Sequence, residues 1–239
     1  ATLALRLGGH AGPPLAAGLC APLVSQPPRR AARPTTCRMF ETPLIERFSR
    51  VHPAAPFLFW LPVLAYFIHR SVTIAGLQTS LALVPAGLLF WSLLEYVLHR
   101  WVFHWIRPTA FGRRFHFILH GVHHDFPQDG MRLVFPLGVS IPLGATVYLL
   151  FFAIFRGPSV DPFFVGFGAG YLAYDGIHYA THHFRMSSRL GKWLKRYHMV
   201  HHHTGENARW GVSTPLWDWV FGTMGQDRAS APRERAEAS

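Results

Sequence analysis

The sequence predicts an all-α integral membrane protein with four transmembrane helices in two hairpins and a cytosolic helical cap. Two observations carry this prediction. Half of the 239 residues are hydrophobic and only 15% are charged, whereas about a quarter of a typical soluble domain is charged. Thirteen of the 16 histidines fall between His99 and His203, where they recur at fixed spacings.

The N-terminal region differs in composition from the rest of the chain. Residues 1–38 contain five arginines, no acid and many Ala, Pro and Gly, and the first methionine is Met39. We expect a targeting or disordered extension outside the mature protein at 1–38, a membrane domain at 39–225 and a disordered tail at 226–239. Without those five arginines the net charge falls from +11 to about +6, which suits an anionic membrane surface. We expect no nucleic-acid partner, because the sequence resembles neither a helix that reads a DNA groove nor an aromatic platform on which bases stack.

Four apolar segments follow a short amphipathic stretch at Met39–Arg50. They are Val51–His69, Ser71–Leu94, Leu133–Phe155 and Gly157–Tyr174. The first three contain no Asp, Glu, Lys or Arg, and the fourth contains only Asp161. A bilayer core requires about 17–25 residues of helix, so each segment is long enough to span it. The alternative is a soluble all-α protein with four buried helices.

Basic residues set the expected orientation. Segments 99–114 and 185–196 carry four and five Lys or Arg, whereas each hairpin turn carries one arginine, Arg70 or Arg156. Because Lys and Arg mark the cytosolic side, we expect both histidine-rich stretches, the active site and both termini to lie there.

The histidines form four motifs, two of the form H-x-x-H-H, one H-x-x-x-H and one H-x-x-x-x-H. The members are His99 and His104; His120, His123 and His124; His178 and His182; and His198, His201 and His202. Steps of three and four residues place side chains on one face of a helix. Two motifs follow each hairpin, so all four should meet at one level. Ten imidazoles are enough for two metals, whereas a structural zinc site needs only four ligands.

The metals must be bound by nitrogen or oxygen, because Cys20 and Cys37 are the only cysteines and precede the apolar segments. Zinc, copper and iron all accept imidazole. We expect iron if the metals serve oxygen chemistry, since zinc is not redox-active; zinc is a possible occupant in isolated protein. Three further histidines lie beside motif positions: His116, His183 and His203. Each is an additional metal ligand, a hydrogen-bond donor that supports a ligand, or a neighbour without a role in the site.

The motifs lie in stretches that resemble the fatty acid hydroxylase superfamily of membrane non-haem di-metal enzymes, and most of all the fatty acid 2-hydroxylases that act on sphingolipid acyl chains. The matching stretches are HRWVFH (99–104), HFILHGVHHDFPQDGMRLVFP (116–136), YDGIHYATHH (174–183), and KRYHMVHHH through WGVSTPLWDWVFGT (195–223). The resemblance implies that the ten motif histidines bind two iron ions and that O2 is the co-substrate. It also implies that Tyr174, Asp175 and Tyr179 lie near the metals and the lipid head group. Asp175 would orient an imidazole ligand or cap the end of a helix. Trp217 and Asp218 would form a packing and helix-capping element that closes the cytosolic cap.

The function implied is a membrane-bound di-iron oxygenase that hydroxylates a fatty acyl chain at carbon 2. A metal site at the cytosolic lip of the bilayer agrees with this position, because it reaches carbons close to a lipid's polar end. No stretch matches the H-P-G-G signature of the cytochrome b5 domain that fungal and animal members carry. We therefore expect electrons from a separate donor such as cytochrome b5, or ferredoxin with its reductase.

Three alternatives remain open. A sterol or carotenoid hydroxylase or desaturase of the same superfamily would share the metals. A haem-binding membrane cytochrome requires histidines buried in mid-helix, and a metal transporter requires polar groups near the bilayer midplane; the motifs instead follow the apolar segments. For the membrane we prefer the bacterial inner membrane, with the endoplasmic reticulum as the alternative.

Overall fold

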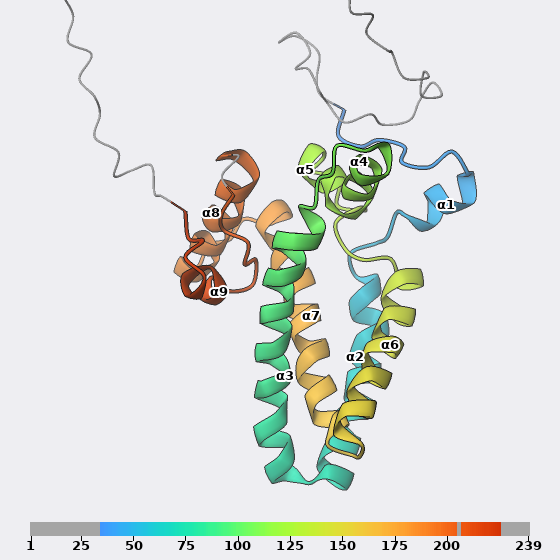
Figure 1. Ribbon diagram of the computed structural model, residues 1–239, viewed down its shortest axis with the longest axis vertical. Coiled ribbons are helices and arrows are strands. Elements are labelled where there is room, and N and C mark those ends of the chain that lie inside the picture. The colour runs from blue at the N-terminus through green and yellow to red at the C-terminus, as the bar shows by residue number, and fades with distance from the viewer. Residues whose placement is uncertain (1–33, 205–206, 226–239) are drawn as a thin grey trace, which may run out of the picture.

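The computed structural model describes residues 34–204 and 207–225, and every regular element within them is a helix. Four long helices stand side by side with shorter helices forming a cap at one end (Figure 1). The long helices are α2 (Ala55–Arg70), α3 (Leu77–Leu98), α6 (Leu137–Phe155) and α7 (Val160–His183). The cap helices are α1 (Pro43–Phe48), α4 (Ala110–His116), α5 (Val122–Asp125), α8 (Arg189–Thr204) and α9 (Leu216–Val220). The predicted all-α class is confirmed.

Three helices continue into one turn of π-helix. These turns are η1 (Ser71–Ala75) after α2, η2 (His99–Phe103) after α3 and η3 (Phe117–Gly121) after α4. A π-turn contains one more residue than an α-helical turn and is frequent at functional sites. Two of the three carry motif histidines.

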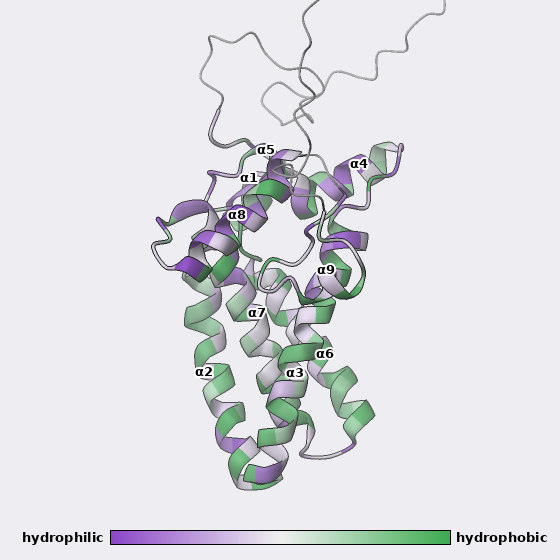
Figure 2. Ribbon diagram, turned by 90° about the vertical axis from the view of Figure 1, so that its left-hand side faces the viewer, coloured by the Kyte–Doolittle hydropathy of each residue, from purple (hydrophilic) through white to green (hydrophobic). Residues whose placement is uncertain are grey.

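Three helical stretches are long and apolar enough to cross a membrane: Ala55–Ala75, Leu77–Phe103 and Leu137–Phe155. Large apolar side chains on them face outward, with Leu58 75%, Leu81 68% and Ile154 73% exposed. Figure 2 shows the long helices as predominantly hydrophobic and the cap as more hydrophilic. An apolar outer surface of this extent suits lipid contact. That α7 is a fourth span, and that the spans insert as two hairpins, remain predictions.

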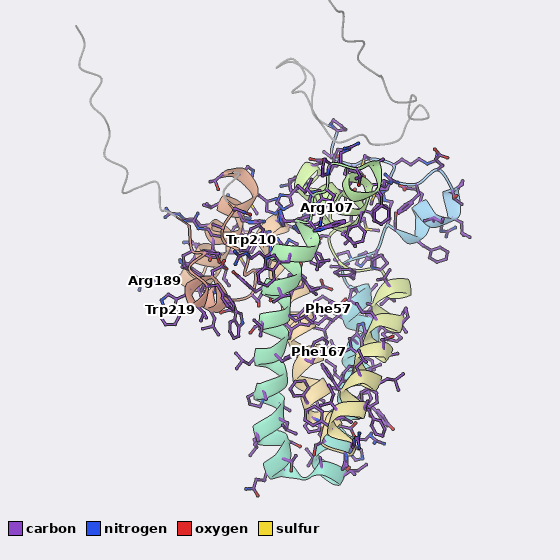
Figure 3. The ribbon with its side chains drawn as sticks, in the orientation of Figure 1. Phe57, Arg107, Phe167, Arg189, Trp210 and Trp219 are labelled. Carbon is purple, nitrogen blue, oxygen red and sulfur yellow. The ribbon has the colours of Figure 1, made fainter. Side chains whose placement is uncertain are left out.

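Helix α7 organises the bundle, because α2, α3 and α6 all pack against it. Their shared core contains Trp60, Leu64, Phe151, Phe164 and Phe167, and Figure 3 shows Phe57 and Phe167 between the long helices. The apolar segment predicted to end at Tyr174 continues as helix to His183. This extension carries the third histidine motif from the bundle into the cap.

Helices α3 and α7 touch backbone to backbone. A Cβ added at Gly166 of α7 would lie 1.9 Å from the carbonyl oxygen of Val84, and one at Gly87 of α3 would lie 2.0 Å from that of Phe163. Small residues allow such close approach between membrane helices. At the end far from the cap, the fully buried Asp161 accepts from Arg70 Nε and the Tyr148 hydroxyl, both at 2.9 Å.

The N-terminal part of the described chain packs on the cap. Met39 is buried with Phe117, Val122 and Phe126, and the hydroxyl of Thr36 donates to Asp129. These contacts begin before Met39, yet the proposed division at residue 38 remains a prediction. Residues 1–33, 205–206 and 226–239 lie outside the described residues, and with them most of the predicted extension and the predicted tail.

Candidate metal centre

The ten predicted histidines come together where the long helices meet the cap, in two groups of five. Group A contains His99, His104, His120, His124 and His201. Group B contains His123, His178, His182, His198 and His202. In each group the five candidate ligand nitrogens lie within 4.8 Å of one another. All four motifs therefore meet at one level, and each group combines histidines that are distant in the sequence.

Helical spacing explains how each motif converges. His120 is the penultimate residue of turn η3, and α5 follows directly with His123 and His124. Helix α7 places His178 and His182 one turn apart, and α8 does the same for His198 and His202. The five-residue step from His99 to His104 fits a π-turn, since the backbone N–H of His104 donates to the carbonyl of His99 at 3.3 Å.

The imidazole nitrogens have the separations of ligands around one ion. In group A, Nε2 of His120 lies 3.1 Å from Nε2 of His99 and 3.0 Å from Nε2 of His124. In group B, Nε2 of His123 lies 2.9 Å from that of His178 and 3.0 Å from that of His202. An imidazole nitrogen binds zinc at about 2.0–2.1 Å, so two ligands at right angles lie about 3.0 Å apart. The residues present therefore fit a metal in each group.

Groups A and B are in direct contact with each other. The rings of His124 in group A and His202 in group B stack with their centroids 4.1 Å apart, and His123 and His124 are adjacent in the chain. Two metals held here would be close neighbours, as in two-metal enzyme sites.

Two imidazoles of group A have a fixed tautomer. Nδ1–H of His99 donates to the carbonyl of Trp210, and Nδ1–H of His201 donates to the carbonyl of Ala208 at 3.0 Å. Each ring then presents the lone pair of Nε2 to the centre of the group. Outer hydrogen bonds of this type orient histidine ligands in metal sites.

Burial also keeps the members of groups A and B that lie beyond the apolar spans neutral. Desolvation, followed by the neighbouring imidazoles, lowers the pKa of His104 to about 3 and that of His124 to about 2. The same causes lower the pKa of His120, His123 and His198 well below the usual range. A neutral imidazole is the form that binds metal.

The other predicted site residues lie around the groups. Tyr174 is buried with its ring 5.4 Å from that of His178. Tyr179 stacks on His183 at 4.4 Å. Asp175 is fully buried, and its carboxylate oxygens have no hydrogen-bond partner among the described residues. The predicted roles of these three residues remain predictions.

The three neighbouring histidines belong to neither group. His116 donates from Nδ1 to the carbonyl of Phe103 at 2.6 Å, and the exposed His203 donates to that of Met199 at 2.8 Å. His183 packs against Tyr179. Of the roles considered for these residues, direct ligation has no support in the geometry.

The residues between α8 and α9 are a part of this site that the histidine spacing does not predict. The ring of Trp210 lies 4.8 Å from that of His104 and 5.2 Å from that of His201, and Figure 3 shows Trp210 beside the cap end of α3. The carbonyls of Ala208 and Trp210 leave no signature in the sequence. The only available signal was the match of the stretch beginning at Trp210 to the family.

Comparisons with known proteins agree with this geometry. The model of the family described as "Fatty acid hydroxylase" matches residues 84–223. A dihydroceramide fatty acyl 2-hydroxylase of Arabidopsis thaliana is 36% identical over 202 residues, which cover 82% of this chain and 83% of that protein. The ceramide very long chain fatty acid hydroxylase of Saccharomyces cerevisiae is 37% identical over 79% of this chain and 49% of its own length. Mouse fatty acid 2-hydroxylase is 32% identical over 81% of this chain and 57% of its own.

A solved structure is also similar. It is described as full-length scs7p with only the hydroxylase domain visible. The TM-score is 0.75 at 32% sequence identity, over 82% of this chain and 74% of that one.

Proposed function

The chain belongs to the fatty acid hydroxylase family, and from this premise we propose that it is a membrane monooxygenase that hydroxylates a fatty acyl chain at carbon 2. The observation that carries the proposal is the pair of five-histidine groups in contact with each other at the cap end of three apolar helices. The relatives named above are hydroxylases of fatty acids or ceramides. A sphingolipid acyl chain is therefore the proposed substrate.

We propose one iron ion in each group, with the ten histidines as ligands. Bound iron would supply the redox chemistry by which O2, two external electrons and two protons convert a C–H bond to C–OH, with the second oxygen leaving as water. The chain's own contribution is to hold ten neutral imidazoles in place. Burial of His99, His120, His178 and His198, each at most 4% exposed, keeps bulk water away from the centre.

The proposed carbon-2 position follows from depth. Histidines of groups A and B lie where the apolar stretches end at the cap. His99 is within the last turns of the stretch Leu77–Phe103, and His178 and His182 are at the cap end of α7. A lipid whose tail lies along these stretches would bring the carbons near its polar end to the metals. A cavity of about 720 Å³ opens between α1, the approach to α2 and the approach to α6. Its wall includes Leu119 and Val122, the chain neighbours of two ligands, so we propose it as a site for part of the lipid.

The electron donor is proposed to be a separate protein, such as cytochrome b5, or ferredoxin with its reductase. Exposed basic residues in the first half of α8 include Arg189, Lys192 and Arg196, and Arg189 projects from the cap in Figure 3. A surface of this sign steers an acidic partner toward the metal centre. We propose that this basic face lies in the cytosol, because Lys and Arg mark the cytosolic side of membrane proteins. The relatives reported above are eukaryotic, which gives no support to the bacterial inner membrane over the endoplasmic reticulum.

Two alternatives are less well supported. A sterol or carotenoid enzyme would share the histidines, but the relatives named above act on acyl chains. A haem-binding cytochrome would need space for a macrocycle between two histidines. In each group five ligand nitrogens lie within 4.8 Å, which leaves no such space.

The test replaces one histidine of each group. His123→Ala and His201→Ala should each abolish the 2-hydroxy fatty acids formed by expressing cells, as measured by mass spectrometry of extracted lipids. His203→Ala is the matched control, because this exposed imidazole belongs to neither group. Membrane fractionation checks that all three variants insert. Normal product from both group variants would contradict the proposed ligands.

A further inference from the structure

The loop between α8 and α9 holds one half of the metal centre by its backbone. We call residues 208–215 the bracket loop. The two carbonyls that accept from group A histidines, those of Ala208 and Trp210, both belong to it. Between them lies Arg209, whose φ of 62° is in the left-handed region. A non-glycine residue rarely adopts this conformation and requires support from its surroundings.

Two buried carboxylates supply that support. Asp218 of α9, which is fully buried, accepts from the backbone N–H groups of Trp210 at 2.9 Å and Gly211 at 2.7 Å. Glu95 of α3, only 3% exposed, accepts from the N–H groups of Val212 at 2.6 Å and Ser213 at 2.8 Å. Four consecutive N–H groups of the bracket loop are thus bound by two side chains.

The loop is also closed at its far side. The hydroxyl of Thr223 donates to Asp218 at 2.8 Å, and the N–H of Arg209 donates to the carbonyl of Thr223 at 2.8 Å. Gly211 is required here, since a Cβ would lie 2.0 Å from the carbonyl oxygen of Thr214. The bracket loop therefore has little freedom to turn its carbonyls away from His99 and His201.

Within residues 34–204 and 207–225, no backbone carbonyl accepts from Nδ1 of a group B histidine. Nδ1 of His178, His182 and His198 is buried without a hydrogen-bond partner among the described residues. The carbonyls of the bracket loop contact His99 and His201 of group A. The support is therefore one-sided.

We infer that Glu95 and Asp218 are positioning residues, which fix the orientation of His99 and His201 through the bracket loop and so make metal retention in group A, but not in group B, depend on them. This inference rests on the metal centre of the proposed function. Loss of an outer hydrogen bond typically lowers metal affinity about 10–100-fold. A metal in group A should weaken by that factor when the bracket loop is released.

The two carboxylates differ in how they tolerate an amide. One oxygen of Glu95 accepts both N–H groups, and the other accepts from the Ser213 hydroxyl. In Glu95→Gln the amide NH2 would face only that hydroxyl, which can rotate to accept. Both oxygens of Asp218 face backbone N–H groups. In Asp218→Asn one N–H must therefore face the NH2, where no hydrogen bond can form.

The experiment measures zinc bound by the purified full-length chain. Zinc chloride is added, then a chelator is titrated, and bound zinc is determined by mass spectrometry. Asp218→Asn should release one zinc at about 10–100-fold lower chelator concentration than the unmodified chain, while the second zinc is unchanged. Glu95→Gln should retain both, whereas Glu95→Ala should behave as Asp218→Asn. Asp129→Asn, a change at another buried carboxylate of the cap, is the matched control and should retain both.

A second set of variants identifies the weakened group. Asp218→Asn combined with His120→Ala of group A should hold the same zinc as His120→Ala alone. Combined with His123→Ala of group B, it should lose the remaining tight zinc. Gel filtration in detergent checks that each variant is folded, and Glu95→Gln keeps the test decisive because it is nearly isosteric.

Three outcomes would overturn the inference: two tight zinc ions in Asp218→Asn, equal loss from both groups in a folded variant, or loss of zinc in Glu95→Gln. An unmodified chain that binds two zinc ions but makes no hydroxylated lipid would refute the proposed reaction and leave the positioning role standing. An unmodified chain that binds no metal would refute both.

Discussion

A single methyl group at Gly166 should test whether the contact between α3 and α7 holds the histidines in register. A Cβ at this position would lie 1.9 Å from the carbonyl oxygen of Val84 and 2.9 Å from the backbone nitrogen of Leu88. Both are backbone atoms, so no side chain can rotate away. Gly166→Ala can be accommodated only if one helix moves.

The size of the movement follows from the contact distance. A Cβ essentially never lies within 3.0 Å of another heavy atom, so the two backbones must part by at least about 1.1 Å, and overpacking of this kind lowers stability by about 1–3 kcal/mol. His178 follows Gly166 by 12 residues on the same helix, about 18 Å along the axis. A displacement of about 1 Å that reaches reacting groups can lower the rate by about 100-fold.

The assay compares Gly166→Ala with Gly157→Ala. Gly157 lies in the turn between α6 and α7, and a Cβ there would meet only the carbonyl oxygen of Phe155, at 4.0 Å. Thermal unfolding in detergent and 2-hydroxy lipid formation in cells are measured for both variants. We expect lower thermal stability and much less product for Gly166→Ala, with little change for Gly157→Ala. If the two variants behave alike in both measurements, the close backbone contact does not position the site.

Three further predictions concern the metals, pH and the membrane. Removal of metal by a chelator should abolish hydroxylation in isolated membranes, and ferrous iron should restore product formation where zinc does not, because zinc is not redox-active. Metal-free protein should lose stability as the pH falls below about 6.5, which is the pKa of histidine in the unfolded chain. Burial lowers the pKa of His104 in the folded protein to about 3, so below pH 6.5 the unfolded chain binds more protons and unfolding is favoured. Equal unfolding temperatures at pH 7.5 and 5.5 would contradict this prediction. Trp219 of α9 is 73% exposed and projects from the cap in Figure 3, so we expect its side chain to lie in the membrane interface. In vesicles, Trp219→Phe should reduce the fraction of tryptophan fluorescence that brominated lipid quenches. An unchanged quenched fraction would place the Trp219 side chain in water.

The sequence predicts which histidines come together, because the spacing within each motif is a local property. Steps of three and four residues on a helix bring His120 beside His124 and His198 beside His202 without any knowledge of the tertiary fold. The all-α class follows equally directly from the long apolar segments. The division of the ten histidines into groups A and B does not follow, since it depends on how α5, α7 and α8 pack.

Other features could not be predicted because their signals are weak or absent. The polarity change at Tyr174 and Asp175 suggests the end of a helix, yet α7 continues to His183 because burial in the cap replaces burial in the bundle. Glu95 is one acid after a long apolar segment, and its three hydrogen-bond donors, which belong to Val212 and Ser213, follow more than 110 residues later. Backbone carbonyls such as that of Trp210 are common to every residue type. Each of these features is set by tertiary contacts.

The π-turn at His99–Phe103 changes the direction in which the residues that follow it point about the axis of α3. Each residue of an α-helix turns the chain by about 100°, so one extra residue redirects everything that follows while adding little height. The bilayer thickness dictates how long α3 must be, and that length would by itself leave the next ligand pointing in an arbitrary direction. An inserted residue corrects the direction without changing the depth. Helix length and ligand aim can in this way be adjusted independently at the membrane surface.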